Sequence, residues 1–129
     1  MRLLLELLAL WALWDLAVVP LLGVRQLLPW RLADMLVAGR RPLLVDVRTP
    51  LEFRLFHIPG SRNLPYPPDL SALAGEDRDR PVVVVCMTGH RSPFAARTLR
   101  KAGFTRVANL TWGASAYALL GGDVQSGKD

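Results

Sequence analysis

Two strand-length runs of mostly apolar residues, 43–47 and 82–85, constrain the fold of this chain more than any other feature. Runs of this length and composition are typical of strands that are buried on both faces. Between and after them come segments with helical spacing of apolar residues. Strands that alternate with helices predict an α/β fold, in which helices cover both faces of a parallel sheet.

Proline and glycine indicate where the other helices and turns begin and end. A helix over residues 30–38 begins after Pro29 and is closed by Gly39, and a helix over 91–102 ends at Gly103. Shorter helices are expected at 50–53, 70–74 and 115–120, and a last strand at 107–110. Residues 58–68 contain four prolines and predict only turns and extended chain.

An apolar segment, residues 3–23, precedes these elements. It contains ten leucines and two charged residues, Glu6 and Asp15, and it is about the ~20 residues long that a bilayer crossing needs. The two acids would lie on opposite sides of a helix, so no polar face favours a position on a surface. We therefore expect residues 1–23 to form a membrane anchor, residues 24–120 one domain, and residues 121–129 a polar tail.

Two alternatives to an anchor stay open. A secretory signal peptide fits Met1-Arg2 and the leucines, although Asp15 and the lack of a small-x-small cleavage site oppose it. The segment could also be a helix packed on a soluble cytoplasmic domain. For an anchor, the positive-inside rule puts the domain on the cytoplasmic side of the inner membrane, because four arginines follow the segment: Arg25, Arg31, Arg40 and Arg41.

Charge and cysteine content exclude several classes of function. The formal net charge is +5, but the basic residues are scattered and do not alternate with aromatic residues, so no nucleic-acid surface is predicted. The single cysteine, Cys86, excludes an internal disulfide and a metal cluster built from several cysteines. We expect neither a metal nor a cofactor.

Cys86 follows the strand at 82–85 directly and is followed by a glycine-containing turn and a helix. In open parallel sheets, ligands bind at the carboxyl ends of strands, where helix amino termini also converge. The N–H groups of such a turn, with the helix dipole, stabilise a thiolate and hold an anion beside it. The alternative is an unreactive buried cysteine, which is common in protein cores.

Three blocks of sequence favour the reactive cysteine. Residues 86–92, Cys-Met-Thr-Gly-His-Arg-Ser, resemble the active-site loop of the single-domain rhodanese family. The upstream block 46–53 and the block 57–63, which contains His-Ile-Pro-Gly-Ser and Asn63, resemble the opening signature of that family at the same spacing. Gly103-Phe104, Val107 and Leu110 match the segment after the loop. The resemblance spans residues 24–117 and implies a three-layer α/β/α fold with a mostly parallel sheet.

The resemblance also implies an activity, that of a thiosulfate sulfurtransferase. Cys86 would take the outer sulfur of thiosulfate or of a protein persulfide, keep it as a persulfide, and pass it to a thiol or cyanide. The loop would bind the anionic sulfur and the donor through Met87, Thr88, Gly89, His90, Arg91 and Ser92. Asp46, Arg48, Glu52 and His57 are expected to be structural residues near the site.

One position departs from the family pattern. Trp112-Gly113 stands where two glycines are common, so an indole would lie beside the site, as a rim or as part of the core.

Two rival functions also remain. A phosphatase of related fold would have five residues between Cys86 and Arg91, where this chain has four. A binding module of the same fold without catalysis frequently lacks the cysteine.

Overall fold

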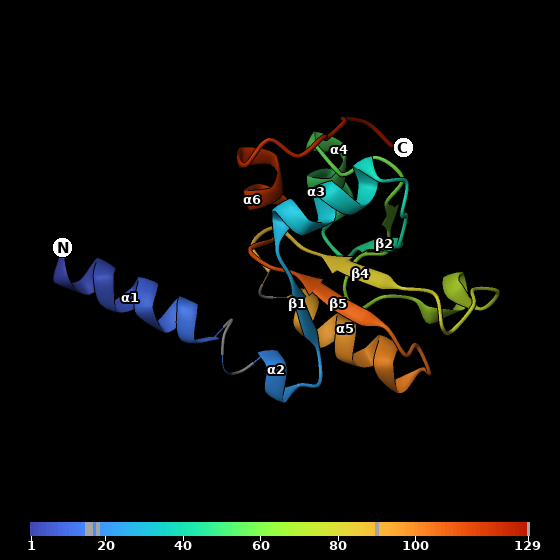
Figure 1. The fold of residues 1–129 in the computed structure, drawn as a ribbon, viewed down its shortest axis with the longest axis horizontal. Helices are drawn as coiled ribbons and strands as arrows, with labels where there is room; N and C mark the ends of the chain where they lie inside the picture. Colours follow the sequence, from blue (N-terminus) through green and yellow to red (C-terminus); the bar gives the residue numbers. More distant parts are fainter. Residues whose placement is uncertain (15–16, 18, 90, 129) are drawn as a thin grey trace.

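The computed structural model describes residues 1–14, 17, 19–89 and 91–128. This part of the chain forms a five-stranded parallel sheet in the order β1-β5-β4-β2-β3. The strands are β1 (Arg25–Leu27), β2 (Leu43–Asp46), β3 (Arg62–Asn63), β4 (Val82–Val85) and β5 (Val107–Leu110). Figure 1 shows helices on both sides of this sheet, so the predicted α/β fold is confirmed.

The central strands are buried on both faces because their side chains alternate between two apolar clusters. Leu43 pairs with Val82 and shares its face of the sheet, whereas Leu44 pairs with Val83 on the opposite face. The first face carries Val82, Val84 and Cys86. It is covered by α5 (Ser92–Lys101), by the 3₁₀ helix η2 (Leu70–Leu73) and by α2 (Val19–Leu21).

The second face is covered by α3 (Pro29–Val37) and α6 (Gly113–Leu119). Leu32 from α3, and Ala114 and Tyr117 from α6, pack on Val83 and Val85. Helix α4 (Pro50–Leu55) begins with a complete capping box between Thr49 and Glu52. Proline at the first helical position of α3 and α4 explains why the sequence located both starts within a residue.

The two edge strands were not predicted as strands. β1 reads Arg-Gln-Leu and is partly exposed, and β3 has two residues within the segment expected to be turn and extended chain. A strand paired on one side needs no apolar run, so periodicity gives no signal there. Pairing with β5 and β2 alone defines these strands.

The expected membrane-spanning helix over residues 3–23 is not found. Helix α1 (Arg2–Leu13) has 12 residues, about 18 Å at 1.5 Å per residue, against a hydrocarbon core of about 30 Å. Val19, in α2, is buried in the first cluster, which holds the end of the segment against the domain. Among the residues that the structure describes, no helix has the length and apolarity that a crossing requires. Asp15 lies outside them.

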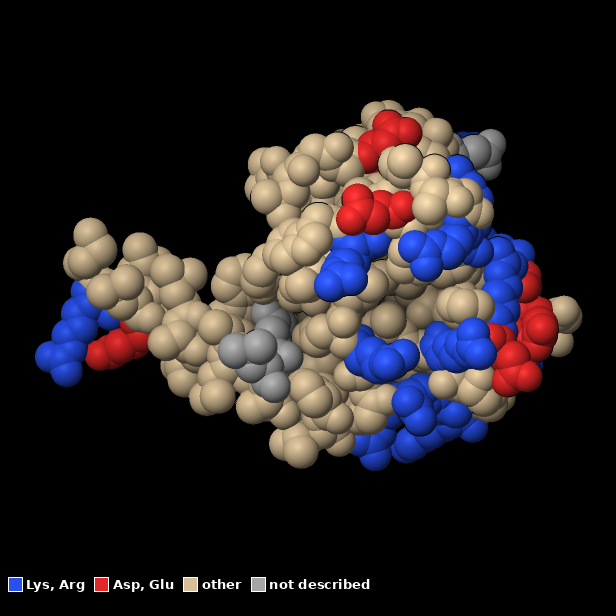
Figure 2. Space-filling view, in the orientation of Figure 1, with Lys and Arg blue, Asp and Glu red and all other residues tan. Residues whose placement is uncertain are grey.

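Helix α1 projects from the domain (Figure 1), and Figure 2 shows its charged groups together at its free end. Its seven leucines are 46–67% exposed, and its one ion pair joins Arg2 to Glu6.

The carboxyl-terminal segment, by contrast, lies against the domain. Gln125 forms an antiparallel bridge with His57, and Gly127 N–H donates to the carbonyl of Arg54, so the expected polar tail packs on the domain.

Candidate active site

The thiol of Cys86 lies at the carboxyl end of β4, between the sheet and the start of α5. The side chain is 1% exposed. Its Sγ atom accepts a hydrogen bond from the Gly89 N–H at 2.9 Å, and the Ser92 hydroxyl lies 3.3 Å away. Two donors of the chain thus converge on one sulfur, an arrangement that favours negative charge on it.

Helix α6 fixes the loop that follows Cys86. The Cys86 carbonyl accepts from the Ala114 N–H at 2.8 Å, and the Met87 carbonyl accepts from both the N–H and the hydroxyl of Ser115, at 3.1 and 2.7 Å. Gly113 permits this approach, because a Cβ atom there would overlap the Cys86 carbonyl. The start of the loop is therefore held by the backbone of a neighbouring helix.

Close approach also explains the glycine within the loop. Gly89 has φ +88°, and a Cβ atom there would lie 2.8 Å from the Trp112 nitrogen. Trp112 itself has φ +61°, a left-handed conformation that costs roughly 1–2 kcal/mol for a residue with a side chain. The indole is half-buried and lies against Trp30, with ring centroids 6.4 Å apart. The indole therefore packs on α3, while the Trp112 backbone lies against Gly89 of the loop.

Arg91 lies at the N-cap of α5 and forms an ion pair with Glu52 of α4. Its Nη2 donates to the two carboxylate oxygens at 3.2 and 3.4 Å, and the side chains are 44% and 24% exposed. Burial raises the pKa of Glu52, but hydrogen bonds from Thr49 and Arg91 outweigh it, and the net pKa is lowered. The pair thus places a partly exposed cation at the start of α5, in the same loop as Cys86.

Asp46 and Arg48 form a fully buried ion pair at the end of β2. The guanidinium donates through Nε and Nη2 to both Asp46 oxygens, at 2.8–3.1 Å, and also to the Phe56 carbonyl at 2.5 Å. The Asn63 amide bridges the carbonyls of Asp46 and Arg48. This network ties β2 to β3 and to the end of α4, and no atom of it is bonded to the thiol.

His57 is buried and stacks on Phe53, with ring centroids 3.7 Å apart. Its Nδ1 lies 2.8 Å from the Phe53 carbonyl, which can only accept, so Nδ1 carries the hydrogen. Nε2 then accepts from the Gln125 amide at 3.1 Å. All these partners belong to α4 and the carboxyl-terminal segment, so His57 is linked to structure rather than to Cys86.

The remaining loop residues differ in exposure. Met87 is half-buried and Thr88 is exposed. His90 lies outside the residues that the structure describes. The structure thus brings Gly89 and Ser92 to the sulfur, and Arg91 with Glu52 to the outer edge of the loop.

Two residues near Cys86 were missed from sequence. Asn109, in β5, is buried and bonded to Ser92, and Gln26, in β1, is bonded to Asn109. A single amide within the apolar run Val107–Leu110 was the available signal. A buried amide requires partners, which places it in a polar network.

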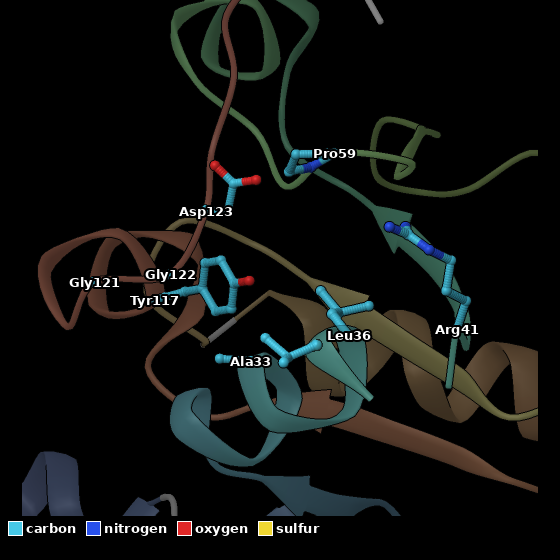
Figure 3. Close-up of a pocket in the computed structure, with 9 residues that line it drawn as sticks. Ala33, Leu36, Arg41, Pro59, Tyr117, Gly121, Gly122 and Asp123 are labelled. Carbon is cyan, nitrogen blue, oxygen red and sulfur yellow. The ribbon is translucent and has the colours of Figure 1, made fainter. Parts of the chain in front are cut away.

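A cavity of about 260 Å³ lies away from the thiol, between α3, the end of α6 and the turn at Pro59. Figure 3 shows the Tyr117 ring and the Asp123 carboxylate at its wall. Burial, followed by the charge of Asp123, raises the pKa of Tyr117.

Among the described residues, no group of three or more His, Cys, Asp or Glu side chains is arranged to hold a metal ion.

Comparison with known proteins identifies the family. Residues 29–119 match the model of the rhodanese-like domain. The chain therefore belongs to the rhodanese-like family, and the predicted resemblance is confirmed. The solution structure of the rhodanese-like domain of Alr3790 from Anabaena superposes with a TM-score of 0.71 at 27% identity, over 78% of each chain.

Curated relatives carry sulfurtransferase names. The chain is 39% identical over 92 residues to the probable adenylyltransferase/sulfurtransferase MoeZ of Mycobacterium tuberculosis, covering 70% of this chain but only 24% of that protein. It is also 39% identical over 71 residues to the thiosulfate sulfurtransferase GlpE of Stutzerimonas stutzeri, covering 55% of this chain and 65% of that protein. Both of these relatives are thus sulfurtransferases by name.

Proposed function

We propose that this protein is a sulfurtransferase that carries sulfane sulfur as a persulfide on Cys86. The observation that carries the proposal is the pair of donors at Sγ, the Gly89 N–H at 2.9 Å and the Ser92 hydroxyl at 3.3 Å. Both stabilise the charge that the sulfur bears as nucleophile and as leaving group.

The reaction has two steps. In the first, the Cys86 thiolate attacks the outer sulfur of thiosulfate; a new S–S bond forms, the old one breaks, and its electron pair leaves with sulfite. In the second, an acceptor thiolate or cyanide attacks the outer sulfur of the persulfide, and the S–S electron pair returns to Sγ. The thiolate that the first step consumes and the second regenerates carries its charge on Sγ, within reach of these two donors.

The substrates that fit are small or present a terminal sulfur at a narrow tip. Sγ is 1% exposed, so a bulky group cannot reach it without movement of the loop. We assign the oxygens of thiosulfate, or the anionic end of another persulfide donor, to Arg91, which is exposed at the mouth. Met87, Thr88 and His90 would complete the wall that faces the donor.

We also propose that α1 attaches the domain to a lipid bilayer. Its leucines point in all directions and are 46–67% exposed, although a helix that is apolar on all sides is normally buried in protein or lipid. We place the attachment on the cytoplasmic leaflet of the inner membrane, because its anionic surface attracts basic residues such as those at 25, 31, 40 and 41.

Intact mass of the full chain after incubation with thiosulfate tests the sulfurtransferase proposal. We expect a gain of one sulfur atom that cyanide removes with release of thiocyanate. The Cys86→Ser variant, which keeps the size of the side chain, is expected to gain nothing and to unfold at the same urea concentration. A chain that gains no sulfur from thiosulfate or from a low-molecular-weight persulfide would be a binding module, and hydrolysis of an aryl phosphate instead would identify a phosphatase.

A further inference from the structure

A chain of hydrogen bonds runs from the buried thiol to the partly buried Gln26 at the edge of the sheet. The Ser92 hydroxyl lies 3.3 Å from the Cys86 Sγ and also contacts the Asn109 Oδ1. The Asn109 Nδ2 donates to the Gln26 Oε1 at 2.9 Å, and that oxygen also accepts from the Thr111 hydroxyl at 2.9 Å. Ser92 and Asn109 are completely buried.

The Ser92 hydroxyl cannot serve both of its acceptors at once. A serine hydroxyl has one hydrogen, and here a sulfur and an amide oxygen both lie within its reach. When Cys86 is a thiol, Ser92 can donate to Asn109 and accept from the thiol hydrogen. When Cys86 is a thiolate, donation to the sulfur gives the stronger, charge-assisted bond. The two acceptors therefore compete for one proton.

The orientation of the Asn109 amide maintains this competition. The Gly89 carbonyl, 3.5 Å from the Asn109 Nδ2, can only accept, so the atom that faces it must be the NH₂ group. Gln26 presents an oxygen to the same NH₂ group. The amide oxygen is consequently turned toward Ser92, and β1 keeps it there.

We propose that Asn109 is a positioning residue that sets the reactivity of Cys86 through the Ser92 hydroxyl. Asn109 holds the Ser92 hydroxyl beside the sulfur. While Cys86 is a thiol, the Asn109 amide oxygen accepts the hydrogen bond from that hydroxyl. Ser92 turns to the sulfur when charge develops there. This inference rests on the proposed function and deepens it. The same rotation of the Ser92 hydroxyl would accompany release of sulfur to an acceptor, because the electron pair of the broken S–S bond then returns to Sγ.

The test measures alkylation of Cys86 by iodoacetamide as a function of pH, followed by intact mass. Ser92→Ala removes the donor and is expected to raise the midpoint of the rate profile by about one pH unit, since a hydrogen bond to a charged group has this magnitude. Asn109→Leu removes the competing acceptor and is expected to lower the midpoint by about half a unit. Disturbed packing alone does not produce shifts of opposite sign.

Two further variants separate this coupling from other causes. In the double variant Ser92→Ala with Asn109→Leu, the midpoint should equal that of Ser92→Ala, because Asn109 acts only through the hydroxyl. Asn109→Ala also removes the acceptor without adding charge, so it should lower the midpoint as Asn109→Leu does. It keeps the proposal testable if Asn109→Leu does not fold. Thr98→Val removes a hydroxyl on the exposed face of α5 and is the matched control, with no expected shift.

Charged groups on the elements around Cys86 stay constant in this comparison. They include Arg91 and Glu52, which pair with each other, the buried pair Asp46–Arg48, and the basic residues of α5, Arg97, Arg100 and Lys101. His90 belongs to the same loop and is likewise unchanged. An upward shift in Asn109→Leu, or additive shifts in the double variant, would overturn the proposal. Alkylation requires no sulfur transfer, so failure of the proposed function would leave this result readable.

Discussion

Replacement of Arg91 by alanine should separate substrate binding from stability. The ion pair with Glu52 has contacts of 3.2 and 3.4 Å, but its side chains are 44% and 24% exposed, and pairs of this kind contribute about 0.2–1 kcal/mol. Arg91 has helical backbone angles at the N-cap, which alanine also adopts. We therefore expect Arg91→Ala to lower the free energy of unfolding in urea by no more than about 1 kcal/mol.

The effect on thiosulfate turnover should be much larger. A hydrogen bond to a charged group is worth roughly 1.5–3 kcal/mol, so its loss in the transition state lowers kcat/KM about 10- to 100-fold. Glu52→Gln is the complementary variant, because glutamine preserves the capping box at Thr49 and removes the charge that competes for Arg91. It should lower KM for thiosulfate about two- to fivefold. The reasoning fails if Arg91→Ala retains a third or more of the wild-type kcat/KM, or loses more stability than catalysis.

Three other perturbations test the fold and the surface. Arg48→Met should destabilise the chain by about 3–5 kcal/mol, because it leaves the buried Asp46 carboxylate unpaired; a urea midpoint within error of wild type would contradict this. The pKa of Glu52 is lowered in the folded chain, so the stability that this group contributes is present above its ordinary pKa near 4.5 and is lost as pH falls through the lowered pKa. Unfolding free energies of wild type and Glu52→Gln, measured against pH in acid, should converge only in that range. Full-length protein should sediment with lipid vesicles in high salt, and a variant with Leu4, Leu7 and Leu8 changed to serine should stay in the supernatant; equal sedimentation of both would remove α1 as the attachment.

The sequence alone determined the elements whose side chains are buried on both sides. The runs at 43–47 and 82–85, the prolines at 29 and 50 and the glycines at 39 and 103 predicted strands and helix ends to within two residues. Apolar periodicity and backbone punctuation are local properties, so they can be read without the fold. The position of Cys86 at the end of a central strand followed from the same pattern.

Tertiary structure alone decided the contacts that join distant segments. The edge strands β1 and β3 exist through pairing, and β1 brings Gln26 to Asn109, 83 residues away. The amino-terminal segment illustrates the limit most clearly, since its composition predicted a crossing helix, whereas α1 ends at Leu13 and Val19 packs in the core. Hydropathy measures how much apolar surface a segment must bury, but not which surface buries it, and that choice is made by the neighbours that the fold supplies.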